Sequence, residues 1–351
     1  MADLLPDRGG FRFPAPYGTF GVRVTNETDG DVRPIGMAYW PNLNYSAGLA
    51  ELRVLVSIYD DLVIFAVDKA SGHVRREMQL PYRSTGEGCY WSIGDPDRVY
   101  IPVGDSLIAH DISSGIRHSV YTPGRARQWH TSGDGTVHSL TLDDAPAVSR
   151  RGAFERYSVH VPFDECHIDR SGRWLLLKEG DDNSVIDLYD PNVRRVITNA
   201  GGAVGHSDMG FGYMVGEDDY ADQPGAFRLW TFGDEGLMDL GIVYHQRDWA
   251  PMMRYVSHAN ARPIPPDMQT VLFSSSYDGD APRANELVTA RLDGSNACRV
   301  MCPNLTVLRG APGSDERYWS AVRANIDPLG EWACWSGNHG TDRQDVFLVR
   351  L

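Results

Sequence analysis

Short apolar segments recur along the whole chain, and this repetition constrains the fold more than any other feature of the sequence. Residues 53–80 contain three of them in a row, "RVLVSIYD", "LVIFAVDKASG" and "VRREMQL", and residues 88–122 contain the next four. Aspartate, asparagine, glycine and proline separate the segments, and these residues tolerate the backbone angles of tight reversals. Amphipathic stretches with a helical period are almost absent. The chain is therefore expected to consist mostly of short strands joined by hairpins.

The strands group into units of about four strands and 40 residues, a period typical of β-propeller blades. Seven units are expected, at residues 35–82, 86–123, 126–162, 163–199, 202–246, 254–304 and 317–351. The last unit has only three strands, which would leave an exposed sheet edge, and the strand at 17–25 can complete it. The sequence thus predicts an all-β fold, a single seven-bladed propeller domain spanning 1–351 and closed by its N-terminal strand.

The composition argues against several classes of function. A formal net charge of −14 argues against nucleic acid as a partner, because proteins that bind phosphate backbones usually present a basic face. The sequence has no apolar run of about 18 residues to cross a membrane, and its acidic N-terminal segment is unlike a secretory signal. The five scattered cysteines do not form a disulfide framework. We therefore expect a cytoplasmic protein.

Polar residues gather on the predicted innermost strands, which line the central channel of a propeller. The candidates are Trp91, His130, His167, His206, Asp208, His258, Asn260, Arg262, Arg323 and Asn325, with Tyr213 close by. His130 and His167 are 37 positions apart, and His167 and His206 are 39 apart, one blade each time. We therefore expect these three histidines and His258 to lie at matching positions around one mouth of the channel.

A mouth lined by imidazole and guanidinium groups suits a ligand that carries carboxylates, because guanidinium pairs with a carboxylate through two hydrogen bonds. Trp91 could stack on a sugar ring at this mouth, or it could fill the core. Tyr213 could likewise face either the mouth or the core. Each histidine could instead be a structural residue bonded to a neighbouring blade. The acidic segment at 217–222 could hold calcium or could be a solvated loop.

The chain resembles the oligogalacturonate lyases and the related propeller polysaccharide lyases. The resemblance covers the blade plan of the whole chain and is best in "ECHIDRSGRWLLL", "GHSDMGFGYMVGED", "SHANARP" and "RANIDPLGEWACWSGNHG". It implies β-elimination on uronate sugars and, in the oligogalacturonate members, a manganese ion held by histidines and a glutamine. In that family, closely spaced histidines of the last blade supply part of the metal set. This chain has Arg323 and Asn325 there, so arginine could replace the ion, and manganese or calcium is a candidate cofactor.

β-Elimination requires a cation beside the uronate carboxylate, a base for the neighbouring proton and an acid for the leaving oxygen. The predicted cations are Arg323 and Arg262, the predicted bases are His206 and His167, and the predicted acids are His130, His258 and Tyr213. Asn260, Asn325, Trp91, Asp208 and Arg262 would bind the substrate, an acidic oligosaccharide or polysaccharide.

Two other classes of function remain open at this stage. A propeller that binds a glycan or a protein without turnover would present the same ring of residues. A protein-interaction scaffold is the third hypothesis, although the chain lacks the paired Gly-His and Trp-Asp signatures of such repeats.

Overall fold

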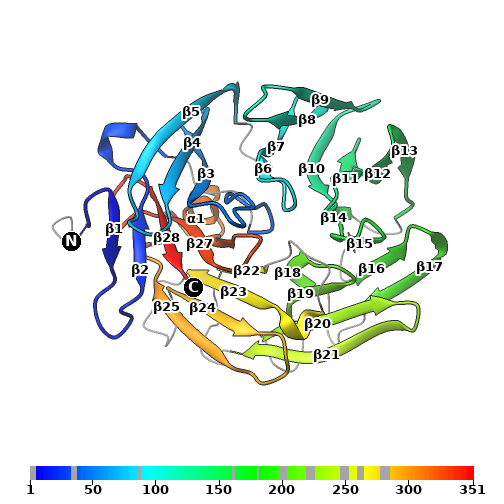
Figure 1. Ribbon diagram of the computed structural model, residues 1–351. Helices are drawn as coiled ribbons and strands as arrows, with labels where there is room; N and C mark the ends of the chain where they lie inside the picture. Colours follow the sequence, from blue (N-terminus) through cyan, green and yellow to red (C-terminus); the bar gives the residue numbers. More distant parts are fainter. Residues whose placement is uncertain are drawn as a thin grey trace.

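The computed structural model describes residues 5–32, 38–84, 88–159, 163–179, 182–197, 204–218, 226–245, 253–258, 265–276 and 285–351. In these ranges seven small antiparallel sheets stand around a central axis (Figure 1). The sheets are the blades of a seven-bladed β-propeller. The predicted fold class and the predicted blade number are therefore confirmed, while the domain limits 1–351 stay a prediction.

Each blade is an antiparallel meander whose strands follow one another outward from the axis. Blades 1 to 3 contain β3 (Glu51–Ile58), β4 (Asp61–Asp68) and β5 (Val74–Arg83); β6 (Tyr90–Trp91), β7 (Arg98–Val103), β8 (Ser106–Asp111) and β9 (Arg117–Tyr121); β10 (Ala126–Thr131), β11 (Val137–Leu142), β12 (Ala145–Arg150) and β13 (Ala153–Arg156). Blades 4 to 6 contain β14 (Phe163–Ile168), β15 (Trp174–Glu179), β16 (Asp182–Asp187) and β17 (Asp190–Ile197); β18 (Val204–Met209), β19 (Tyr213–Asp218), β20 (Ala226–Gly233) and β21 (Gly236–His245); β22 (Met253–His258), β23 (Thr270–Ser276), β24 (Glu286–Arg291) and β25 (Cys298–Pro303).

Blade 7 is built from both ends of the chain. Its strands are β26 (Asn325–Ile326), β27 (Trp332–Gly337) and β28 (Asp345–Arg350), followed by β2 (Phe20–Arg23) and β1 (Gly9–Arg12). Val22 pairs with Leu348 and is fully buried, so the N-terminal strand closes the ring as predicted (Figure 1). The outermost strand β1 was not predicted. It forms a hairpin with β2 and covers the edge that β2 would otherwise expose.

The innermost strand of blade 1 is irregular but present. Leu43 forms an isolated bridge with Val54, the Leu55 N–H donates to the Asn42 carbonyl, and the Asn44 N–H donates to the Arg53 carbonyl. This segment lies beside β3 at the place of an inner strand, although the regular sheet of blade 1 has only the three strands β3, β4 and β5. The segment carries Tyr39 and Trp40 into the centre of the molecule, where both are buried.

The same turn follows the first strand in blades 4 and 7. The Asp169 carboxylate accepts hydrogen bonds from the backbone N–H groups of Arg173 and Trp174 at 2.9 Å each. Asp327 does the same in blade 7, with Glu331 and Trp332. Both turns then need a residue with positive φ, because the chain must reverse in four residues, and glycine supplies it at 172 and 330.

The core lies between successive blades, because side chains alternate between the two faces of each sheet. Leu175 and Leu177 of β15 pack toward blade 3, whereas Leu176 packs toward blade 5 with Met209 and Met214. One α-helix, α1 (Asp315–Ser320), precedes the first strand of blade 7. Within the described ranges, no helix has the length and the apolar character needed to cross a membrane.

Candidate functional site

The register between first and second strands fixes the depth of each channel residue. In each first strand, we take the residue just before the last one that pairs with the second strand. These residues form one layer, termed the inner layer: Tyr90, His130, His167, Asp208, Ser257 and Asn325. His130 and His167 therefore occupy matching positions, as expected. The equivalent position in blade 5 holds Asp208, so the expected match does not extend to His206.

A second layer lies two residues earlier on each first strand and is termed the outer layer. It contains Glu165, His206 and Arg323. Residues two apart on a strand point to the same side, so these side chains lie on the same side as the inner layer, nearer the end of the channel where the first strands begin. His206 is thus the counterpart of Glu165 rather than of His167. The spacing of 39 residues misled because blade 4 is longer than blade 3: equivalent positions are 41 residues apart from His167 to Asp208 but 37 apart from His130 to His167.

Bulges interrupt the first strands of three consecutive blades at the outer layer. The register shifts between Arg127 and His130 in β10, between Phe163 and Glu165 in β14, and between Val204 and Ser207 in β18. A bulge re-aims the side chains beside it and is common next to functional sites. In blade 5 the bulge leaves His206 outside the regular ladder, whereas in blade 4 it precedes Glu165, which still pairs with Lys178.

The inner-layer histidines form a compact cluster with Glu165 and with Tyr39 from blade 1. The imidazole rings of His130 and His167 stack with centroids 3.9 Å apart, and the Tyr39 ring lies 4.9 Å from the first and 4.6 Å from the second. The Tyr39 hydroxyl donates to Glu165 Oε2 at 2.9 Å. All four residues are buried, which closes this side of the channel.

Lys178 of β15 neutralises the carboxylate of this cluster. Its ammonium group donates to Glu165 Oε1 at 2.6 Å, and both side chains are less than one-tenth exposed. His167 Nε2 lies 3.2 Å from the same oxygen. A buried ion pair of this kind holds one geometry, because losing either partner leaves an uncompensated charge.

Burial decides the protonation of the cluster. Burial lowers the pKa of His130 well below its ordinary value, and the neighbouring His167 lowers it further. Burial also lowers the pKa of His167, although Glu165 opposes the shift. Burial alone would raise the pKa of Glu165, but Lys178 and His167 reverse this and hold the pKa well below its ordinary value. At neutral pH the imidazoles are therefore uncharged and Glu165 is ionised.

Asp208 lies beside a second buried cation. Arg170 approaches Asp208 Oδ1 to 3.6 Å and donates to the backbone carbonyls of Thr131 and Tyr39 at 3.1 and 3.3 Å. Arg170 thus ties blades 1, 3 and 4 together around the channel. Asp208 was predicted to bind substrate, and at 2% exposure it instead contributes to this buried network.

His206 differs from the other two described channel histidines because it reaches solvent. Its side chain is 31% exposed, and Nδ1 lies 3.4 Å from Glu217 Oε2. Its backbone N–H donates to the same oxygen, also at 3.4 Å. Glu217 follows the cross-strand partner of Ser207. The acid of blade 5 therefore lies on the second strand, whereas in blade 4 the acid Glu165 lies on the first strand and Lys178 on the second. A carboxylate near Nδ1 orients an imidazole ring.

Arg323 is held between two aromatic rings at the start of blade 7. Its guanidinium carbon lies 4.3 Å from the ring centroid of Tyr318 and 4.7 Å from that of Trp319. One of its N–H groups donates to the Tyr318 carbonyl. Arg323 is 1% exposed, while Trp319 is 37% exposed. The guanidinium therefore places positive potential behind the Trp319 indole without lying at the surface itself.

Three further predicted residues have packing roles in this structure. Trp91 is fully buried with Leu55 and Val99 between blades 1 and 2, which does not support a sugar-stacking role. Tyr213 is fully buried in the core between blades 5 and 6. Asn325 donates to Asn42 Oδ1 at 2.9 Å and accepts from the Asn42 N–H at 3.1 Å, which fastens blade 7 to blade 1.

The remaining predicted residues lie outside the described part of the chain. This applies to Asn260, to Arg262 and to the side chain of His258, and the backbone of His258 ends β22. Their predicted roles in catalysis and substrate binding stay predictions.

The sequence reasoning missed the charged partners of the histidines. Glu165 stands two residues before His167, and strand alternation alone places the two side chains on one face. Lys178 and Glu217 each stand near the end of a second strand whose other residues are largely apolar, where a charge needs a buried partner. Tyr39 comes from blade 1, far along the chain, and no local pattern indicates its contact.

His130, Glu165 and His167 could hold a metal ion. One ligand atom of each lies within 4.8 Å of the others, and imidazole nitrogen with carboxylate oxygen is a donor set that transition metals take. His130 Nε2 is buried and has no hydrogen-bond partner among the described residues, and the buried His167 Nε2 has only the Glu165 carboxylate at 3.2 Å. The residues therefore fit a divalent ion.

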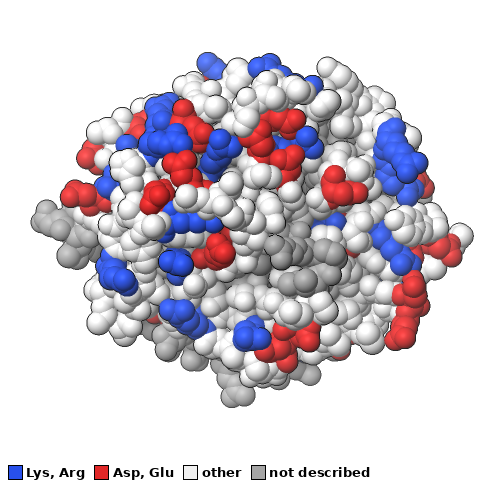
Figure 2. All heavy atoms as spheres, in the orientation of Figure 1, with Lys and Arg blue, Asp and Glu red and all other residues white. Residues whose placement is uncertain are grey.

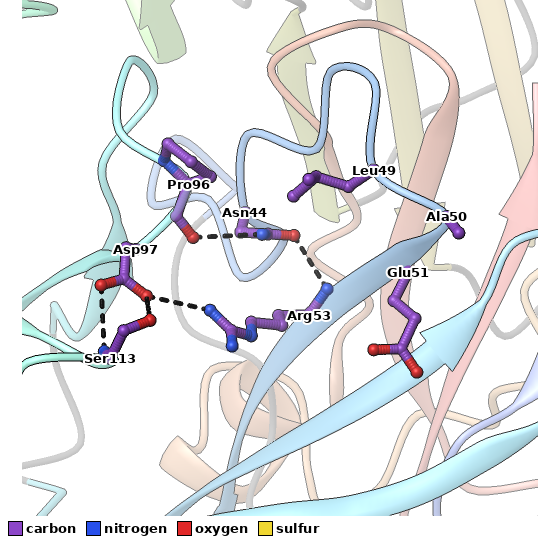
Figure 3. A pocket seen from close by; sticks show the side chains of 8 residues that line it. All are labelled: Asn44, Leu49, Ala50, Glu51, Arg53, Pro96, Asp97 and Ser113. Carbon is purple, nitrogen blue, oxygen red and sulfur yellow. Dashed lines mark hydrogen bonds and ion pairs between the residues drawn. The ribbon is translucent and has the colours of Figure 1, made fainter.

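The surface gives less information about function than the channel does. Acidic and basic side chains are interspersed on the face shown in Figure 2. A pocket of about 680 Å³ lies between blades 1 and 2, beside the loops that follow their first strands. Its Asn44, Arg53 and Asp97 bond to one another or to their neighbours, with Arg53 and Asp97 3.1 Å apart (Figure 3). The polar groups of this pocket thus form a mutually paired network away from the histidines.

Comparisons with known proteins identify the architecture. No protein-family model and no curated protein matches the sequence. An oligogalacturonate lyase in complex with manganese superimposes over 98% of both chains, with a TM-score of 0.66 and 11% identity. The oligogalacturonate lyase of Vibrio parahaemolyticus gives a TM-score of 0.67 over the same shares, also at 11% identity.

Other solved structures share the fold. A chain in the mitotic checkpoint complex superimposes over 96% of this chain and 98% of its own, with a TM-score of 0.55 and 14% identity. A lyase and a checkpoint component thus use one architecture, so the fold does not decide the function. The chain has the seven-bladed β-propeller fold of the oligogalacturonate lyases.

Proposed function

We propose that the protein is a carbon–oxygen lyase that cleaves an oligosaccharide containing uronic acid by β-elimination. The supporting observation is the pair of His206 and Glu217 in the outer layer. His206 is partly exposed, whereas His130 and His167 are 3% and 1% exposed. A base must touch the carbon acid that it deprotonates, so His206 is the described histidine best placed to act on a substrate in the channel.

The base step follows from this geometry. Glu217 at Nδ1 orients the ring and leaves Nε2 to accept the proton from the carbon next to the uronate carboxylate. The electron pair of that C–H bond forms the new double bond, and the C–O bond to the neighbouring sugar breaks. The imidazolium that forms is stabilised by the Glu217 carboxylate, as in other carboxylate–histidine pairs.

Neutralising the substrate carboxylate is the second requirement. Arg323 shares the outer layer with His206 and supplies positive potential behind Trp319. Arg262, outside the described residues, is the other predicted cation. A divalent ion held by the buried His130, Glu165 and His167 would add positive potential behind the channel wall, and imidazole ligands favour a transition metal over calcium.

His258 is assigned the role of the acid that protonates the leaving oxygen. His130 and Tyr213 are buried at 3% and 0% exposure, so neither reaches a ligand in the channel in this conformation. His258 ends β22 in the blade next to His206, although its side chain lies outside the described residues.

Absorbance in the ultraviolet tests the proposal, because elimination conjugates the new double bond with the carboxylate whereas hydrolysis and binding do not. Oligouronides should give a rising absorbance, and His206→Ala should lower the rate by roughly 100-fold or more, the scale of losing a general base. The matched control is His73→Ala, which removes an exposed histidine at the turn between β4 and β5 and should leave the rate unchanged.

A broad panel of uronides without an absorbance rise, with and without manganese, would overturn the lyase. Binding of one of those uronides that His206→Ala abolishes would then establish the alternative, a glycan-binding propeller that uses the same mouth.

A further inference from the structure

The cluster of His130, Glu165 and His167 contains buried polar atoms that the described protein satisfies poorly. His130 Nε2 has no hydrogen-bond partner among the described residues, and His167 Nε2 has only the Glu165 carboxylate at 3.2 Å. Buried polar atoms almost always have partners, so these two adjacent nitrogens require an explanation. The two rings lie 3.9 Å apart, and the Glu165 carboxylate is the acidic group beside them.

The surroundings of the cluster preorganise these ligands. Tyr39 packs against both imidazole rings and holds Glu165 Oε2 through its hydroxyl. This leaves Oε1 directed at His167, at 3.2 Å from Nε2. The imidazole rings are 26° from parallel, so a shared ion requires them to turn slightly toward each other.

Lys178 is the competing cation. Its ammonium occupies Oε1 at 2.6 Å, the same oxygen that an ion between the two histidines would use. With Lys178 in place the cluster is neutral overall, because one positive and one negative charge cancel. An ion must therefore displace the ammonium from Oε1 or share the oxygen with it.

We propose that His130, Glu165 and His167 bind one divalent first-row transition-metal ion inside the channel, and that Lys178 competes with this ion for Glu165. The mixed nitrogen and oxygen donors select manganese, cobalt or zinc over calcium and magnesium, which prefer oxygen ligands alone. The site lies on blades 3 and 4 rather than on the last blade. It does not depend on lyase activity, because the ligands are buried behind Tyr39.

Cobalt(II) is the probe, since its visible absorption reports coordination directly. Protein treated with a chelator should take up one equivalent of Co²⁺, which Zn²⁺ should displace at similar concentration and Mn²⁺ only in large excess, and Ca²⁺ should not compete. His167→Gln should weaken Co²⁺ binding by about 100-fold. Removing a residue that only hydrogen-bonds to a metal ligand already weakens metal binding by up to about 100-fold. His138→Gln removes a buried histidine outside the cluster and should leave the affinity unchanged.

Lys178→Met provides the second arm. Removing the ammonium leaves Glu165 buried without its cation, so the variant should bind Co²⁺ at least 10-fold more tightly than the unsubstituted protein. Co²⁺ should also raise its unfolding temperature more.

Two outcomes would overturn the site. One is the absence of stoichiometric Co²⁺ uptake in both the unsubstituted protein and a folded Lys178→Met variant. The other is uptake that His167→Gln does not weaken, which would place the ion elsewhere. Because the readouts are absorption and unfolding temperature, a negative lyase assay leaves this test intact.

Discussion

At the scale of single residues, the partly exposed His206 contrasts with several buried histidines among the residues that the structure describes. His130, His138 and His167 are each less than one-tenth exposed, and burial lowers the pKa of all three. His138 accepts or donates a hydrogen bond with Thr131 Oγ1 at 3.0 Å, and the Thr131 hydroxyl continues to Tyr90 at 2.7 Å. These histidines fold in the neutral form, which couples the stability of the propeller to pH.

The pH dependence has a definite sign. The pKa of His138 falls from 6.5 to about 4 on folding because the ring is buried. Its stabilising contribution is therefore complete above pH 6.5 and is lost as pH falls toward 4, up to about 3 kcal/mol. The unfolding temperature should drop over this range, and His138→Gln should drop less steeply. Parallel slopes for the two proteins in thermal unfolding at pH 7, 6, 5 and 4 would contradict this.

At the scale of elements, the blades could be predicted and the register could not. Turn residues and apolar alternation mark each hairpin, so seven units and the closing strand followed from the sequence. Histidine spacing then misplaced His206, because a bulge and a longer blade shift the register by two residues. Counting back from the turn places Asp208 level with His167, since Asp208 precedes Met209 as His167 precedes Ile168.

The repeated turn is itself testable. Asp169 accepts from the N–H groups of Arg173 and Trp174 and, across to blade 5, from Gly212 at 2.9 Å. Asp169→Ala leaves these buried donors unsatisfied and should lower the free energy of unfolding by about 2–4 kcal/mol in denaturant titrations. Asp293→Ala, at an exposed turn of blade 6, is the control and should change it far less. Equal effects would mean that Asp169 has no special role.

At the scale of the whole molecule, blade 7 determines whether the ring is closed. Val22 and Val24 are fully buried, and Arg23 pairs with Asp345 at 2.7 Å across the closure. The partners of this closure come from opposite ends of the sequence, and only the missing fourth strand of the last unit indicated it. The contact of Tyr39 with the histidines spans blades 1, 3 and 4, and nothing in the sequence predicts it.

Removing the closure should destabilise the entire ring. Deletion of residues 1–26 removes β1 and β2, exposes the buried face of β28 and leaves its backbone groups unpaired. The unfolding midpoint should fall sharply in a thermal melt. A deletion of residues 1–7, which keeps both strands, should lower it far less. If the two deletions behave alike, the ring is held closed elsewhere.

The closure also sets an order of events during protein synthesis. Arg23 and Asp345 are 322 positions apart, so β2 leaves the ribosome long before its partner β28 exists. At about 5–20 residues per second, the N-terminal strand waits for tens of seconds with an unpaired edge. The pairing of β2 with β1 is local in sequence, so it needs no residue made later, whereas the pairing with β28 must wait for the end of the chain. The strand that the sequence did not predict is thus the first partner available to β2.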